Sequence, residues 1–331
     1  MNSFSSRKVF LIFLVCALGA VPLAAKALET NPTNTSSTKQ EPRMLLVKPV
    51  GQKILVSVKP LALIFQSIKR EGDTIEVLVN DGASNHDFQL KPSDLKKIAQ
   101  ADLVIWSGPE YEPFLAKSLA SKERQLNVMA LEKVNYIDLA LVDEHSHTHN
   151  NKHDNEKDNK KASLDVHVWF DARNALELAK AMAKAAYYPE ESTHGLELRL
   201  KVFDAAENQQ TLNKDVAALI VYHDGYRYLE RELGLEHDFV INPDHQLSLS
   251  LKHWQAFMQQ LDDDIKANRR SCIITQAGFE KSPLAAKLAN KKNIKQVEID
   301  SLAAGKEYPD YFSFWLESQN KMKSCFKGGS E

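Results

Sequence analysis

Short apolar segments of strand length alternate with helical segments over most of the chain, and this alternation restricts the fold more than any other feature. In the first half, the predicted strands are residues 54–58, 74–79 and 102–106, and the predicted helices are residues 61–70, 92–99 and 113–120. In the second half, the predicted strands are residues 218–222, 238–241, 272–275 and 296–299, and the predicted helices are residues 226–233, 249–267, 283–290 and 309–323. Strands and helices that alternate at this spacing indicate parallel sheets. The sequence therefore predicts an α/β protein with two Rossmann-like lobes.

A long segment without strand character separates the two halves. Residues 189–216 contain one glycine and no proline after Pro189. Their apolar residues follow a helical spacing and are Leu196, Leu200, Phe203, Leu212 and Val216. This pattern predicts one helix of about 26 residues, roughly 40 Å long at 1.5 Å per residue. We therefore expect an N-terminal lobe at 53–188, a linking helix at 189–217 and a C-terminal lobe at 218–331.

The first 27 residues have the order of a secretory signal peptide. Arg7 and Lys8 precede an apolar run at residues 9–24, and Ala25 and Ala27 supply small residues two positions apart. We expect cleavage after Ala27 and export to the periplasm, with an uncleaved membrane anchor as the alternative. Residues 28–52 are rich in Asn, Thr, Ser and Pro, which predicts a mobile leader.

Cleavage changes the charge of the chain only slightly. It leaves 331 − 27 = 304 residues and removes three basic ones, so 39 basic residues stand against 44 acidic ones, a net charge near −5. An acidic chain of this kind gives no support to nucleic-acid binding. No other run of eighteen apolar residues occurs, so we expect no membrane insertion of the mature chain, which we expect to be a monomer.

The cysteines agree with export. Cys16 leaves with the signal peptide, and Cys272 and Cys325 remain. An even pair in an oxidising compartment predicts a disulfide, with free buried thiols as the alternative. A thiolate metal site is disfavoured because the chain has no Cys-x-x-Cys spacing.

One segment is crowded with metal-ligand side chains. Residues 143–158 read D-E-H-S-H-T-H-N-N-K-H-D-N-E-K-D and hold four of the eleven histidines, namely His145, His147, His149 and His153. A segment without apolar side chains cannot form a core, so we expect a disordered loop at 143–162. Imidazoles and carboxylates in such density indicate the handling of a divalent metal, and a histidine-biased linker without a role is the alternative.

Three histidines outside this loop lie near the ends of predicted elements. His86 comes after the second predicted strand, His223 directly follows residues 218–222, and His167 lies in a short apolar strand or turn before a helix. In open α/β sheets, ligands bind outside the carboxyl ends of the strands, which predicts a metal cleft between the lobes. Asp300 follows the last strand, so three imidazoles and one carboxylate could form a tetrahedral zinc site. Imidazole also suits copper, nickel and iron, so the ligand types alone do not name the metal.

The remaining histidines and the motif content argue against other sites. The four histidines with charged neighbours, expected to be solvated, are His194, His237, His245 and His253. No His-Glu-x-x-His, Gly-x-Ser-x-Gly or phosphate-binding glycine loop occurs in the chain. These absences favour a protein that binds its ligand without catalysis.

Several motifs resemble the periplasmic zinc-binding proteins of high-affinity zinc ABC importers, which belong to the cluster A-I metal-binding solute-binding proteins. The resemblance runs from about Lys53 to the C-terminus and includes the histidine-rich loop and the late cysteine pair. The motifs that carry it are V-S-V-K-P-L-A-L-I, D-G-A-S-N-H-D-F-Q-L-K-P-S-D-L, A-D-L-V-I-W-S-G-P-E, D-V-H-V-W-F-D and V-Y-H-D-G-Y-R-Y.

This resemblance implies a fold and a function. It implies two α/β lobes joined by one long rigid helix, with Zn²⁺ held between them as the transported ligand by His86, His167 and His223. It also implies delivery of the zinc to a membrane permease that a cytoplasmic ATPase drives. The four loop histidines are then weaker accessory ligands, because a disordered segment loses entropy when it closes around an ion.

The chain departs from the family pattern at several points. Asn85 stands where zinc-binding members often carry a glutamate, and the segment T-Q-A-G-F replaces a more acidic family sequence. Asp300 stands where related manganese and zinc proteins take an aspartate as fourth ligand. We expect Asp300 or a water to complete the zinc site. A manganese or iron importer component, a metal-stabilised adhesin and, last, a secreted zinc hydrolase remain as alternatives.

Overall fold

The computed structural model describes residues 51–79, 88–139, 164–207, 212, 217–242, 250–276, 287–288, 291 and 294–327 of the chain. Outside the described residues lie the expected signal peptide, residues 28–50 of the expected leader, His86, His245, the histidine-rich loop at 143–162 and most of the expected helix at 283–290. Within the described residues, no helix has the length and apolar character needed to cross a membrane.

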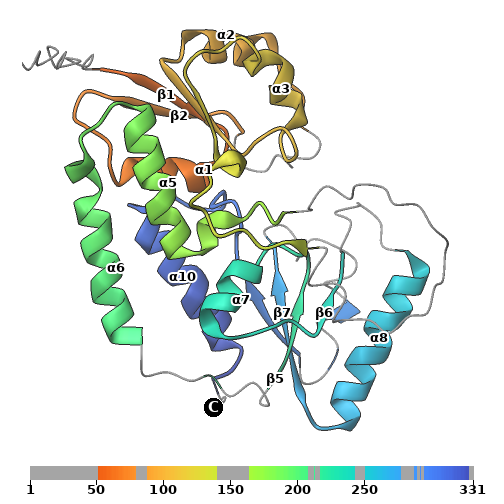
Figure 1. Cartoon of the computed structure of the whole chain (residues 1–331). Coiled ribbons are helices and arrows are strands. Elements are labelled where there is room, and N and C mark those ends of the chain that lie inside the picture. The colour runs from red at the N-terminus through yellow and green to blue at the C-terminus, as the bar shows by residue number, and fades with distance from the viewer. Residues whose placement is uncertain are drawn as a thin grey trace, which may run out of the picture. The chain divides into compact units, whose positions relative to one another are not determined.

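The N-terminal lobe, which carries the labels β1, β2 and α1 to α3 in Figure 1, is built on a parallel sheet with strand order β2-β1-β3-β4. Its strands are β1 (Lys53–Val56), β2 (Thr74–Val77), β3 (Leu103–Trp106) and β4 (Gln125–Asn127). Its helices are α1 (Lys59–Gln66), α2 (Pro92–Gln100) and α3 (Pro113–Leu119), and each has a proline in its first turn, where the missing N–H would have no helical partner. Alternate residues of β3 join two different core clusters, so both faces of the sheet are covered.

The C-terminal lobe repeats this architecture with strand order β6-β5-β7-β8, again all parallel. Its strands are β5 (Ala217–Val221), β6 (Phe239–Val240), β7 (Arg270–Thr275) and β8 (Ile294–Glu298). Its helices are α7 (Arg227–Leu233), α8 (Leu251–Lys266) and α10 (Tyr311–Ser324). The predicted α/β class with two parallel lobes is confirmed.

The strand order gives each lobe an equivalent place for a ligand. The first connection of each sheet leads to one side of the first strand, and the next connection leads to the other side. Chain connections therefore diverge between β1 and β3 in one lobe and between β5 and β7 in the other. Crevices at the carboxyl ends of such strand pairs are the usual ligand sites of doubly wound sheets.

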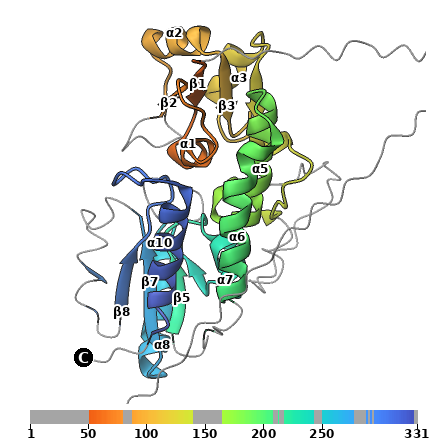
Figure 2. The same ribbon diagram turned by 90° about the vertical axis from the view of Figure 1, so that its left-hand side faces the viewer.

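Two helices, rather than the linking helix alone, run between the lobes (Figure 2). The first is α5 (Ala172–Ala185), and the second is α6 (His194–Glu207), which follows the 3-10 turn η4 (Glu190–Thr193). The helix expected at 189–217 is thus shorter than predicted, with 14 described residues, and Leu212 is not helical. In η4 the hydroxyls of Ser192 and Thr193 donate to the carbonyls of residues 189 and 190, and such local hydrogen bonds compete with an α-helix.

A continuous core joins the two lobes, which belong to one compact unit. The indole of Trp169 donates to the carbonyl of Ser301 (2.9 Å), and the hydroxyl of Tyr311 donates to the carbonyl of Trp169 (2.8 Å). The indole of Trp315 donates to the carbonyl of Phe170 (3.0 Å). The turn η3 (Val168–Phe170) is therefore held by α10 and by the segment after β8. His167 directly precedes this turn.

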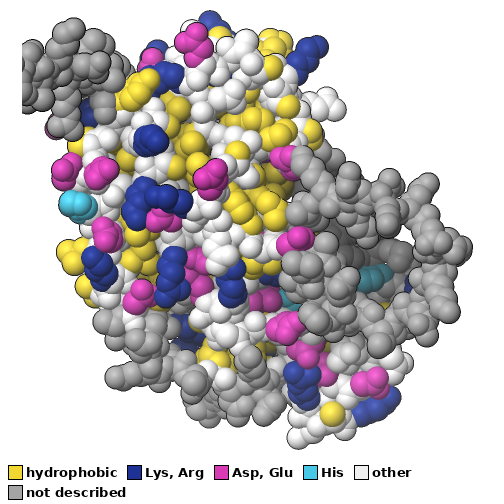
Figure 3. Space-filling view, in the orientation of Figure 1, with side chains coloured by type: hydrophobic (Ala, Val, Ile, Leu, Met, Phe, Trp, Pro, Cys, Tyr) yellow, Lys and Arg dark blue, Asp and Glu magenta, His cyan; other side chains and the backbone are white. Residues whose placement is uncertain are grey.

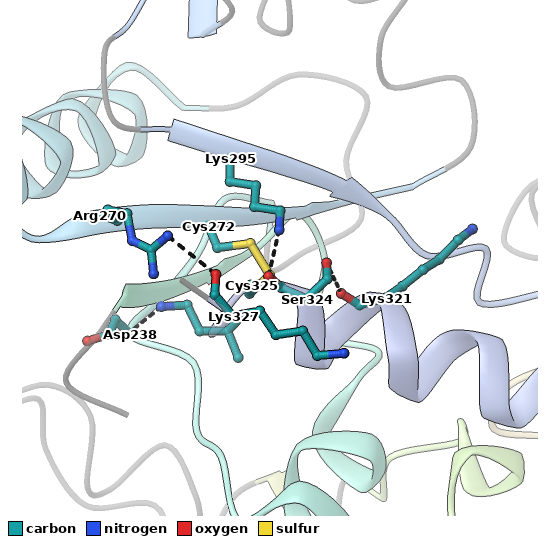
Figure 4. The surroundings of a disulfide bond; sticks show 9 residues. Asp238, Arg270, Cys272, Lys295, Lys321, Ser324, Cys325 and Lys327 are labelled. Carbon is teal, nitrogen blue, oxygen red and sulfur yellow. Dashed lines mark hydrogen bonds between the residues drawn. A yellow bond between two sulfur atoms is a disulfide. The ribbon is translucent and has the colours of Figure 1, made fainter. Parts of the chain in front are cut away.

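The predicted disulfide joins Cys272 of β7 to Cys325 at the end of α10, with Cα atoms 5.5 Å apart (Figure 4). Both cysteines are buried. The ammonium group of Lys295 donates to the carbonyl of Ser324 (2.6 Å), where it offsets the negative end of the helix dipole. The disulfide thus fastens the last turn of α10 to the sheet near the amino end of β7.

Candidate metal site

His167 is buried at the junction of the lobes, with 6% of its surface exposed. Its backbone N–H and its ring Nδ1 both lie within hydrogen-bond distance of Asp165 Oδ1, at 2.9 and 2.8 Å. The carboxylate of Asp171 then accepts from the N–H groups of Arg173 and Asn174 and begins α5. An imidazole whose Nδ1 donates to a carboxylate presents Nε2 as an acceptor or metal ligand. The local sequence D-V-H therefore selects the ring nitrogen that is available.

His223 lies two residues after the end of β5 and is also buried, with 3% of its surface exposed. Its ring centroid lies 5.5 Å from that of His167, with an angle of 61° between the rings. The ring of Tyr226 also packs against His223, with centroids 4.9 Å apart. Two predicted ligands from segments 56 positions apart (223 − 167) are thus brought together at the carboxyl end of β5.

Gly225 allows the backbone to approach both imidazoles. A Cβ atom at this position would lie 2.2 Å from His223 Nε2 and 3.0 Å from His167 Cε1. Both distances are shorter than, or at the limit of, an ordinary contact, so a side chain here would displace at least the His223 ring. The backbone at Gly225, just before α7, therefore forms one wall of the site.

Asp300 lies after β8 in the same region of the C-terminal lobe. One of its carboxylate oxygens accepts the N–H of Leu302 (3.1 Å), and the other accepts the N–H of Gly305. Burial raises the pKa of Tyr226 well above its ordinary value, and the negative charge of Asp300 adds to this effect. Asp300 is therefore an electrostatic neighbour of the residue that packs on His223, while its oxygens hold the turn at residues 300–305.

The structure does not bring a complete ligand set together among the residues it describes. Within that part of the chain, no group of three or more His, Cys, Asp or Glu side chains is placed to hold a metal. His86 and the four loop histidines lie outside it. The assignment of His86, His167, His223 and Asp300 as ligands therefore stays a prediction, of which the His167 and His223 pair is the part with a described geometry.

Described residues on either side of the histidine-rich loop form a bridge a few positions before His167. Asp138 and Leu164 form an isolated antiparallel bridge, and the N–H of Asp165 donates to the carbonyl of Ile137 (2.9 Å). The chain leaves and re-enters the described structure at this bridge, three residues before His167. The loop itself is outside the described residues.

His237 corrects one expectation, because its side chain is buried rather than solvated. Its Nδ1 lies 2.9 Å from a carboxylate oxygen of Glu230. Burial acts to lower the pKa of His237, but the hydrogen bond and attraction to Glu230 outweigh it, so the pKa is raised. This pair connects α7 to the segment before β6. His194 is exposed as expected, and His253 is half-buried with Nε2 near the carbonyl of Val240 (2.7 Å).

Tyr111 and Glu112 are site neighbours that sequence reasoning did not single out. The ring of Tyr111 meets that of His167 edge to face, with centroids 6.3 Å apart. Glu112 is fully buried, and its Oε2 accepts the N–H of Ser107 (2.7 Å). Burial raises the pKa of Glu112 to about 7, although the Ser107 N–H and the Ser57 hydroxyl favour its charged form. A carboxylate beside prolines in a turn carries no signal of burial in the sequence.

This buried acid predicts a pH effect on stability. The pKa of Glu112 is 4.5 when unfolded and about 7 when folded, so the folded state binds the proton more tightly. Proton binding by Glu112 therefore stabilises the folded state fully below pH 4.5. This contribution to the free energy of unfolding, up to about 3 kcal/mol, is lost as the pH rises through 7. We expect Glu112→Gln to remove this loss, so that the metal-free variant gains stability relative to the wild type between pH 5 and 8. Denaturant unfolding of both proteins at pH 5 and pH 8 measures this gain. A free energy of unfolding that changes with pH equally in the variant and the wild type would contradict the prediction.

The two-lobed α/β fold is similar to that of solved metal-binding proteins. The structure of the solute-binding protein FpvC of Pseudomonas aeruginosa with Ni²⁺ matches with a TM-score of 0.62 at 17% identity, over 85% of this chain and 98% of that one. The laminin-binding protein Lmb of Streptococcus agalactiae matches with a TM-score of 0.63 at 16% identity, over 84% of this chain and 100% of that one. At these identities the likeness shows the fold alone.

Sequence comparison then identifies the family. The family model for ZnuA, described as zinc-uptake complex component A, periplasmic, matches residues 54–325. The high-affinity zinc uptake system protein ZnuA of Yersinia pestis is 28% identical over 328 residues, covering 92% of this chain and 96% of that protein. The chain belongs to the ZnuA family of periplasmic zinc-uptake components.

Proposed function

We propose that this protein captures Zn²⁺ in the periplasm and delivers it to the membrane permease of an ABC importer, which a cytoplasmic ATPase drives. The observation that carries the proposal is the buried pair of His167 and His223, with ring centroids 5.5 Å apart, where the two lobes share a core. Family membership supports the same metal and the same compartment. The role is binding and release, without catalysis.

The proposed zinc ligands are His86, His167 and His223, with Asp300 or a water in the fourth position. A set rich in imidazole suits zinc better than manganese, which prefers oxygen ligands. Asp165 holds His167 so that Nε2 can face the ion. The shared core and the α5 and α6 helices support a small, local closure around zinc. We propose that the chain works as a monomer, with residues 53–188 and 218–331 as its lobes and the intervening segment as their link.

Replacement of Asp165 by asparagine should weaken zinc binding about 10- to 100-fold, as is usual for partners that orient a zinc-bound imidazole. The amide nitrogen of asparagine can donate to Nδ1 and so favour the tautomer that carries its proton on Nε2. Competition with a zinc chelator measures the affinity. Asp264→Asn is the matched control, because Asp264 is equally buried but accepts from Ser271 in the C-terminal lobe. Equal affinities of Asp165→Asn and wild type would contradict the orienting role.

Asp300→Asn tests the fourth ligand. If the carboxylate binds zinc, its loss should lower the affinity at least about tenfold, because a neutral amide is a weaker ligand for the divalent cation. The asparagine oxygen can still accept an N–H of the turn, so the 300–305 segment should stay folded. An unchanged affinity would assign the fourth position to water. Thermal unfolding of the zinc-free variant checks that the turn is intact.

We propose an accessory role for the histidine-rich loop. Asp138 and Leu164, the described residues that flank it, form a bridge three positions before His167, so His145, His147, His149 and His153 could gather zinc near the tight site.

We also propose that the protein is exported by the signal peptide at 1–27 and cleaved after Ala27. N-terminal sequencing of the exported protein tests the cleavage position.

Native mass spectrometry of protein purified without chelator, followed by competitive titration with zinc and manganese, tests the function. We expect one tightly bound zinc, weaker additional sites and a preference for zinc over manganese. Deletion of residues 143–158 should remove only the weaker sites. Tighter binding of manganese or iron would favour the related importer components instead. Loss of the tight site on deletion would place that site in the loop.

An adhesin function is the second candidate, because the structure of similar fold from Streptococcus agalactiae is described as a bifunctional protein with adhesin and metal-transporting activity. Binding to host matrix that survives loss of His86, His167 and His223 would favour it.

On the described part of the face in Figure 3, basic and acidic side chains are interspersed rather than gathered in a basic patch. This mixed surface supports no nucleic-acid partner.

A further inference from the structure

Glu112 occupies the place in the N-terminal lobe where chain connections diverge. Ser107 directly follows β3, and Ser57 directly follows the neighbouring strand β1. The carboxylate of Glu112 accepts the N–H of Ser107 (2.7 Å), and the Ser57 hydroxyl lies beside it. The crevice between β1 and β3, which often holds a ligand in doubly wound folds, is thus filled by a side chain of this protein.

The hydrogen bond closes the tight turn between β3 and α3. The N–H groups of Tyr111 and Glu112 both donate to the carbonyl of Gly108, at 3.3 and 2.8 Å. Gly108 has a φ of +126°, and a Cβ atom there would lie 2.6 Å from Asn127 Oδ1. Only glycine fits such a backbone. Although Glu112 stands at the N-cap position of α3, its side chain makes no capping hydrogen bond. Its carboxylate serves the turn instead of the helix.

The turn carries Tyr111 to the proposed ligand His167. Tyr111 is nearly buried, and its ring meets the imidazole edge to face with centroids 6.3 Å apart and an angle of 69°. Trp169 contacts the same imidazole at 5.4 Å, also edge to face, and Asp165 bonds its Nδ1. The N-terminal lobe therefore supplies one of the surfaces that fix the orientation of the His167 ring.

We propose that Glu112 is a positioning residue for the zinc site: its buried carboxyl closes the turn between β3 and α3 and thereby holds the Tyr111 ring against the imidazole of His167. The proposal rests on the proposed function, because it takes His167 to be a zinc ligand. Glu112 acts on zinc only through Tyr111. Its removal therefore matters for binding only while the Tyr111 ring is present.

A double-mutant cycle tests this dependence. Glu112→Ala and Tyr111→Leu should each lower zinc affinity about tenfold. The double variant should bind zinc within about twofold of Tyr111→Leu, because residues that act as one unit are not additive. Glu112→Gln keeps an oxygen for the Ser107 N–H and should stay within about threefold of the wild type. Additive losses in the double variant, or a folded Glu112→Ala protein with wild-type affinity, would overturn the proposal.

A readout on the zinc-free protein separates positioning from general destabilisation. The Hε1 proton of His167, assigned by its loss in His167→Asn, should change its NMR chemical shift in Tyr111→Leu and in Glu112→Ala, but keep it in Glu112→Gln. Asp73→Asn is the matched control, since Asp73 is a buried carboxylate in the same lobe that accepts the N–H of Gln52 (2.7 Å) at the amino ends of β1 and β2. If Glu112→Ala does not fold, Glu112→Met, which fills the same space without an acceptor, replaces it.

The two results together distinguish this proposal from the proposed function. A wild-type protein that binds no zinc refutes the function, and the His167 shift then still reports on the contact between Glu112 and Tyr111. A wild-type protein that binds zinc through His167, with a His167 shift that does not move in Glu112→Ala, overturns the positioning role alone. A shift that moves equally in Asp73→Asn also overturns it.

Discussion

Replacement of His223 by alanine should lower the zinc affinity by about two to three orders of magnitude. Structural zinc sites with four protein ligands bind with about 10–16 kcal/mol, so one ligand accounts for roughly 3–4 kcal/mol. His223 is buried against His167 and Tyr226. A side chain from the protein surface therefore cannot readily replace its imidazole as a zinc ligand. His167→Ala should have an equal effect, because both buried imidazoles are proposed as ligands of the same ion.

Competitive titration with a chromophoric zinc chelator measures this loss, on protein that lacks residues 143–158 so that the loop histidines do not contribute. His194→Ala is the matched control, since His194 is exposed at the start of α6. Its affinity should equal that of the wild type. A His223→Ala protein that folds and retains the wild-type affinity would refute the proposed site, because the pair with His167 is its described part.

Removal of the disulfide should lower the free energy of unfolding by about 4 kcal/mol while leaving zinc affinity nearly unchanged. The bond closes a loop with a sequence separation of 53, and the chain-entropy estimate for this length is about 4 kcal/mol. Zinc affinity is spared because Cys272 lies near the amino end of β7, whereas His223 follows the carboxyl end of the neighbouring strand β5. The double substitution Cys272→Ala and Cys325→Ala is the variant to examine.

Denaturant unfolding of the zinc-free proteins gives the change in stability, and chelator competition gives the affinity. Ser324→Ala serves as a control, because it alters the same turn of α10 without breaking the bond. A stability equal to that of the wild type would show that α10 is held by its packing alone. A large loss of zinc affinity in the folded variant would show instead that the disulfide end of α10 is coupled to His167 through Trp315 and Phe170.

Most of the fold could be predicted from local patterns. Seven of the eight strands in the described residues coincide with predicted ones, because their segments are apolar runs or alternate apolar with polar residues. The exception is β4, whose short sequence Q-L-N has no apolar run and pairs with β3 only because that strand offers its edge. The helix expected from residue 189 begins only at His194, because the periodicity of its apolar residues does not report the hydrogen bonds of Ser192 and Thr193.

The sequence by itself determined the class of the fold, the pairing of the last two cysteines and the candidate ligands at the ends of strands. The fold class and the candidate ligands depend on information within a few residues, such as hydrophobic period, strand ends and motif spacing. The cysteine pairing depends on the fact that two cysteines follow the expected signal peptide. Only the tertiary structure decided that His167 meets His223 and that Tyr111 packs on the same imidazole. Such contacts join segments far apart in the chain, and their geometry is set by how the lobes pack around one shared core.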